Sequence, residues 1–134
     1  MSFRQKTAAR PRTNHATLTF EHSDGSKDVL HIIRATYADR QAVIDAAIRA
    51  GELDPETNEP RNAAGAMTLA ARTLARLLYQ DGKRVYNDSP ADLVALMELD
   101  TFEEWAPIAS AALVGEDPAD SKKPSAPQEE PSVD

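Results

Sequence analysis

The clearest hydrophobic pattern in the chain lies between residues 62 and 80, where apolar residues recur at spacings of three and four. The apolar positions are Met67, Ala70, Ala71, Leu74, Leu77 and Leu78. The positions that fall on the opposite side are Arg72, Thr73, Arg76 and Gln80. The pattern predicts a long amphipathic helix that forms the spine of the core. It would begin at an Asn62 cap and stop at Gly82, a residue that tolerates a positive φ.

A second pattern, nearer the N-terminus, predicts a β-hairpin. Leu18 and Phe20 alternate with polar residues, and Asp24-Gly25 supplies a turn between two strands. The register stays open, because two loop lengths fit. A two-residue loop would place Val29, His31 and Ile33 beside Leu18 and Phe20, whereas a three-residue loop would place Leu30 and Ile32 there. A lone hairpin is marginally stable, so we expect it to pack against helices.

Capping signals predict two further helices. Thr36 and Asp39 form a capping box, and Gly51 is placed to end the helix that follows. The residues expected on its apolar face are Tyr37, Ile44, Ala47 and Ile48. Ser89-Pro90 with Asp92 begins another helix. The residues expected to face inward from it are Leu93, Leu96 and Met97.

A last helix is predicted to start at Asp100, with Glu103 three residues later. Its apolar positions are Phe102, Trp105, Ala109, Ala112 and Leu113. Pro107 falls inside this pattern and should kink the helix or divide it at Ala106.

These elements predict an α+β fold that is mainly α: an N-terminal β-hairpin packed on a bundle of about four helices, with disordered termini. Residues 1–15 are predicted to form a flexible basic arm, and residues 16–114 a single helical domain that includes the hairpin. Residues 115–134 contain four prolines and many charges, which is typical of a disordered acidic tail.

Composition narrows the classes of function. The chain of 134 residues favours one domain. Cysteine is absent, which excludes disulfides, thiolate zinc sites and cysteine nucleophiles. The net charge of −7 argues against nucleic-acid binding. No apolar run approaches the ~20 residues that span a bilayer, and no signal peptide is visible, so we expect a soluble cytosolic protein.

The candidate chemical sites are weak. His22 and His31 lie on opposite arms of the hairpin, but zinc usually takes three or four protein ligands, so an ordinary polar strand is favoured. The acidic residues of the 51–60 loop lack the glycine of a calcium loop. Glu103 and Glu104 point about 100° apart on a helix and cannot share one proton-transfer site. We therefore expect no metal, no cofactor and no enzymatic activity.

Aromatic and apolar residues around the Gly82 turn are the candidate partner-binding site. They are Leu77, Tyr79, Val85 and Tyr86. These residues can seal the end of the core or form a groove for a partner, since aromatic side chains give much contact area for little lost entropy. Phe102 and Trp105 raise the same choice, and their place on an apolar stripe favours core packing.

The order of these segments resembles the tail assembly chaperones of long-tailed bacteriophages, over roughly residues 16 to 117. The resemblance rests on a helix opening R-A-T-Y-A-D-R and on the stretch A-R-L-L-Y-Q-D-G-K-R-V-Y-N-D. It also rests on S-P-A-D-L-V-A-L-M-E-L-D, a last helix ending A-A-L-V-G-E-D, and a charged tail. Pro107 departs from the plainer final helix of that family.

The resemblance implies a protein that binds the tape measure protein, keeps it soluble and helps recruit tail-tube subunits. It implies action in the host cytoplasm, absence from the mature virion, and in many family members a frameshift-extended form. The Lys122-Lys123 pair is where such a frameshift would be sought. Self-association is left open. The alternatives are a small structural or adaptor protein of the virion, in the tail or head–tail connector, and, less favoured, a small enzyme.

Overall fold

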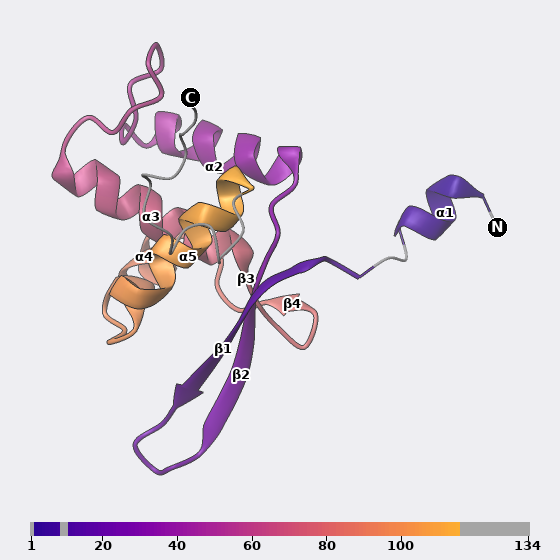
Figure 1. Cartoon of the computed structure of the whole chain (residues 1–134). Helices are drawn as coiled ribbons and strands as arrows, with labels where there is room; N and C mark the ends of the chain where they lie inside the picture. Colours follow the sequence, from indigo (N-terminus) through magenta and orange to yellow (C-terminus); the bar gives the residue numbers. More distant parts are fainter. Residues whose placement is uncertain (1, 9–10, 116–134) are drawn as a thin grey trace, which may run out of the picture.

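The structure is a computed structural model that describes residues 2–8 and 11–115 (Figure 1). The fold is α+β and mainly α, as predicted from the sequence. In chain order the elements are α1 (Phe3–Ala8), β1 (Asn14–Glu21), β2 (Lys27–Ile33), α2 (Tyr37–Arg49), α3 (Ala63–Leu77), β3 (Leu78–Gln80), β4 (Lys83–Arg84), α4 (Pro90–Met97) and α5 (Phe102–Val114). The tail predicted to be disordered lies, from residue 116 onward, outside the described residues.

β1 and β2 form the predicted hairpin, and its register is the one that a three-residue loop gives. His22 N–H donates to the Ser26 carbonyl at 2.8 Å, and Gly25, at φ 89°, closes the turn back to His22. Leu18 therefore lies opposite Leu30. This register puts Leu30 and Ile32 on the face that meets the helices.

The predicted long helix ends earlier than expected, at Leu77, and the chain continues as β3. Asp81 and Gly82 have φ values of 53° and 78°, and Gln80 pairs with Lys83 across them. The positive φ expected at Gly82 is present, but it serves a two-residue hairpin turn and not a helix stop. The result is a four-stranded antiparallel sheet in the order β1-β2-β3-β4.

The core lies between one face of this sheet and helices α3, α4 and α5, while the turn of the β1–β2 hairpin points away from the helices (Figure 1). Trp105 and Phe102 are buried in this core, with 3% and 8% of their surface exposed, in agreement with the prediction that they serve core packing. The fully buried large side chains of this core are Ile32, Leu74, Leu77, Leu78 and Leu96. Alanines 71, 75, 109 and 112 let the helices approach closely.

The three predicted caps are present, because Thr36, Asn62 and Ser89 each accept a backbone N–H from the first turn of their helix. The predicted apolar face of α2 is wrong at its first residue. Tyr37 is 70% exposed, and Val43 is buried in α2 instead. The buried face of α2 runs through Asp39, Val43 and Ala47, and Tyr37, two positions before Asp39, points about 200° away from that face.

The predicted polar side of α3 is also wrong at two positions. Arg72 and Thr73 are buried, whereas Met67 is 56% exposed. Arg72 is buried because the loop after α2 supplies Glu52, whose carboxylate receives Nε and Nη2 of Arg72 at 3.2 and 2.6 Å. A paired guanidinium can be buried where a lone one cannot.

The last helix starts at Phe102 with Thr101 at its cap position, not at Asp100, and Thr101 makes no side-chain capping bond. Pro107 lies inside α5, and the helix continues past it to Val114. Of the two predicted outcomes, a kink or a division at Ala106, the division does not occur. Proline removes one helical hydrogen bond, but burial of Trp105, Ala109 and Ala112 on both sides of it holds the helix together.

The segment predicted as a flexible basic arm contains ordered structure. Residues Phe3–Ala8 form α1, and β1 already begins at Asn14. Arg12 binds the Asp39 carboxylate and donates to the Arg34 carbonyl at 3.2 Å. The end of the basic segment therefore belongs to the folded body.

We predict that Gly65→Ala destabilises the protein although alanine favours a helix by about 1 kcal/mol. A Cβ at Gly65 would lie 2.8 Å from the Glu52 carbonyl oxygen. Relief of that clash must move the loop that carries the buried ion pair, at a net cost of roughly 1–2 kcal/mol. Urea unfolding measures this cost. The control is Ala64→Gly at the exposed neighbouring position, which measures how much a glycine costs in this turn of the helix when no clash is involved. A more stable Gly65→Ala variant would contradict the prediction.

Candidate functional site

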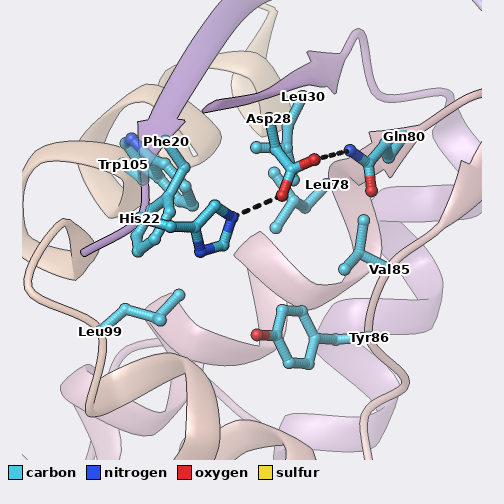
Figure 2. A pocket seen from close by; sticks show the side chains of 10 residues that line it. All are labelled: Phe20, His22, Asp28, Leu30, Leu78, Gln80, Val85, Tyr86, Leu99 and Trp105. Atoms are coloured by element: carbon cyan, nitrogen blue, oxygen red, sulfur yellow. Dashed lines mark hydrogen bonds and ion pairs between the residues drawn. The ribbon is translucent and has the colours of Figure 1, made fainter. Parts of the chain in front are cut away.

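A hollow of about 170 Å³ opens between the β1–β2 hairpin, the β3–β4 hairpin and the start of α5 (Figure 2). Its lining comes from the β1–β2 hairpin, β3, the segment that follows β4, the turn between α4 and α5, and α5 itself. Its lining residues are Phe20, His22, Asp28, Leu30, Leu78, Gln80, Val85, Tyr86, Leu99 and Trp105. Most of the lining side chains are apolar or aromatic, so the hollow can accept an apolar group.

The inner wall of the hollow is formed by side chains that pack against one another. Phe20 meets Trp105 edge to face, with ring centroids 5.9 Å apart and an interplanar angle of 68°. Leu78 is fully buried behind them, whereas Val85 at the rim is 39% exposed. A partner side chain that enters would contact the exposed parts of Phe20, Val85 and Tyr86 without displacing the core.

Three polar side chains of the hollow, His22, Asp28 and Gln80, are hydrogen-bonded to one another. His22 Nε2 lies 2.6 Å from Asp28 Oδ2, and Gln80 Nε2 donates to Asp28 Oδ1 at 3.2 Å (Figure 2). The hydrogen bond from His22, and then that from Gln80, lower the pKa of Asp28 below its ordinary value. His22 also packs edge-on to Phe20, 4.9 Å away. These hydrogen bonds tie the end of the β1–β2 hairpin to β3.

The structure brings together two of the four residues predicted to bind a partner. Val85 and Tyr86 line the hollow and face His22 and Asp28 across it (Figure 2). Leu77 is fully buried in the core and reaches no surface.

Tyr79 lies on the other face of the sheet, where it pairs with His31 and Arg84. Its hydroxyl accepts from Arg12 Nη1 at 3.3 Å, and the guanidinium lies 5.7 Å from the ring centre. Sequence reasoning missed Phe20, Leu78 and Leu99 as neighbours of Val85, because the β3–β4 turn that gathers them was interpreted as a helix end.

The two histidines weighed as a metal pair do not face one another. His31 contacts Thr17 Oγ1 at 3.3 Å on the outer face of the sheet, while His22 is bonded to Asp28 at the hollow. Asp54 is one of the acidic residues of the 51–60 loop that were considered for calcium binding. Its carboxylate accepts a hydrogen bond from the Glu56 N–H within the same turn, at 2.8 Å. Within residues 2–8 and 11–115, no group of three or more acidic, histidine or cysteine side chains is arranged to hold a metal ion.

A second cluster of charged side chains surrounds Asp39, which is 3% exposed. One carboxylate oxygen receives Arg76 Nε at 2.8 Å, and the other receives the Thr36 N–H at 2.9 Å and the Arg12 guanidinium. Burial disfavours the charged carboxylate. The Thr36 hydrogen bond and then the two arginines outweigh burial, so the pKa of Asp39 lies below its ordinary 3.8. The cluster joins the segment before β1, the start of α2 and the end of α3 through one carboxylate.

Comparison of the chain with protein-family models, with curated proteins and with solved structures gives no match. Among the helices of the described residues, none combines the length and apolar character needed to cross a bilayer.

We predict that Asp39→Asn lowers the free energy of unfolding at neutral pH by roughly 2–3 kcal/mol, because two arginines lose their buried partner. The folded pKa of Asp39 is depressed. The stabilisation that ionised Asp39 contributes is therefore complete above pH 3.8, the ordinary pKa of the group in the unfolded chain. This stabilisation is lost as the pH falls through the lower pKa of Asp39 in the folded protein.

The stability gap between wild type and Asp39→Asn should therefore narrow in acid, measured by urea unfolding as a function of pH. Asp45→Asn, at an exposed site on the same helix, is the control and should cost less than about 0.5 kcal/mol. A gap that stays constant down to the acid limit would rule out this role for Asp39.

Proposed function

We propose that this protein is a phage tail assembly chaperone that binds the tape measure protein and keeps it soluble until tail-tube subunits assemble around it. The observation that supports the proposal best is the apolar hollow, since its wall is preformed and three of its polar side chains, His22, Asp28 and Gln80, are already hydrogen-bonded to one another. Such a surface binds by contact and releases its partner without chemistry.

The size of the hollow suits one or two side chains of a client and not a whole helix. Each such contact is weak, and several chaperone molecules along a long client would together cover its apolar side chains. The net charge of −7 supports solubility of the covered client. Tube subunits that bind the same segments more tightly would displace the chaperone.

In this proposal the protein acts in the host cytoplasm and is left out of the mature virion. A frameshift-extended form, if made near Lys122-Lys123, recruits the tail-tube protein through its added domain. The sequence resemblance supports these two points.

We predict that Val85→Ser and Tyr86→Ala reduce the amount of soluble tape measure protein on co-expression, by several-fold for the pair together, because both side chains form the rim of the hollow. The matched controls are Val94→Ser and Tyr37→Ala. These side chains are 50% and 70% exposed, lie outside the lining of the hollow, and should leave client solubility unchanged.

Circular dichroism and thermal unfolding show that each variant is folded before the comparison is made. Equal client solubility with stably folded rim and control variants would remove the hollow as the binding site. Mass spectrometry of purified phage particles tests the class of function separately. The chaperone should be missing from them, whereas an adaptor protein of the virion would be present in fixed stoichiometry.

A further inference from the structure

The two edges of the sheet differ sharply. β4 ends the sheet with only two residues, and so short an edge offers little to another strand. β1, at the other edge, has eight residues and contains neither lysine nor proline. Glu21, at its end, is its only charged residue. The register of β1 shifts once, between Asn14 and Ala16. From Ala16 onward the strand has none of the lysines, prolines or bulges that usually prevent strand pairing between molecules.

The outward-facing backbone groups of β1 can be assigned from the turn. His22 donates to Ser26 across the ladder, and bonded pairs then alternate along an antiparallel pair of strands. The backbone N–H and C=O groups of Leu18 and Phe20 accordingly form hydrogen bonds with β2. The N–H and C=O groups of Thr17, Thr19 and Glu21 point away from β2, toward the open edge. The side-chain contact between Thr17 and His31, at 3.3 Å, agrees with this assignment. Side chains of opposite residues lie closer together in pairs that are not hydrogen-bonded through the backbone.

We propose that this edge binds β1 of a second copy, antiparallel, about a two-fold axis at Thr19, so that one sheet runs through both molecules. Thr19 then lies opposite Thr19, and Thr17 lies opposite Glu21 of the second copy. The half-buried Phe20 ring gains the neighbouring apolar face as further cover.

Charge favours the antiparallel arrangement. Arg12 and Arg34 flank the start of β1, whereas its turn end carries three acidic residues, Glu21, Asp24 and Asp28, against one lysine, Lys27. Antiparallel pairing places the basic end of each copy beside the acidic end of the other, and parallel pairing would set like charges together.

The other available occupant is the chain's own C-terminal segment, residues 116–134. It contains four prolines and several carboxylates, and proline cannot donate to a ladder. A second copy, whose β1 offers an unbroken row of donors and acceptors, is the better match. The inference does not depend on the proposed function.

Two lysine substitutions on the same edge test this register, because they should act in opposite directions. Thr19→Lys places two lysines opposite each other and should raise the dimer Kd about fivefold or more. Thr17→Lys places lysine opposite Glu21 in two symmetric pairs and should lower the Kd about fivefold. Both side chains are exposed in the monomer, so the fold should tolerate either change. Sedimentation equilibrium of the full chain measures each Kd.

Mixing Thr19→Lys with Thr19→Glu should restore the dimer, and hydrogen exchange should show amide protection at Thr17 and Thr19 that rises with protein concentration. A monomer at all concentrations overturns the proposal. A dimer that responds equally to Thr17→Lys and Thr19→Lys, or without concentration-dependent protection of β1, overturns it too.

Discussion

The short ladder between β2 and β3 joins the two halves of this molecule. Only His31–Tyr79 and Ile32–Leu78 pair across it, and both Ile32 and Leu78 are fully buried. This ladder attaches the N-terminal hairpin to the strand that continues directly from α3. The core on one side, the hollow at the hairpin end and the free edge of β1 all take their positions from it.

Much of the fold follows from local signals. The caps at Thr36, Asn62 and Ser89 were predictable because a side-chain oxygen meets an exposed N–H within three residues. The hairpin turn at Gly25 was predictable for a similar reason. Its register was not, since β2 is apolar on both faces and only the loop length decides which face meets the helices.

The largest error came at β3. Leu74, Leu77 and Leu78 keep a helical spacing, and the run from Leu78 to Gln80 has no β-branched residue to signal a strand. The Asp81-Gly82 dipeptide did carry a hairpin signal, the same kind used for residues 24 and 25. Because it was interpreted as a helix stop, Tyr79 and Val85 were grouped on one surface although they lie on different faces of the sheet.

Buried charge is the feature least accessible from the sequence. Arg72 falls on the polar side of a regular helical pattern, and its burial depends on Glu52, which comes from a loop twenty positions earlier. Asp39 was assigned a capping role, which it has, but its partners Arg12 and Arg76 come from distant segments. Periodicity describes one element at a time and carries no information on such partners.

The β2–β3 ladder also has a kinetic consequence. Residues 34–77 separate its strands, so the chain must close this long loop before Ile32 and Leu78 can meet. The β1–β2 hairpin and α3 can form from local contacts, but the hairpin gains its apolar cover only at closure. Docking of α3 and β3 onto the hairpin is thus a natural rate-limiting event in folding, and until it happens β1 and β2 expose two strand edges instead of one.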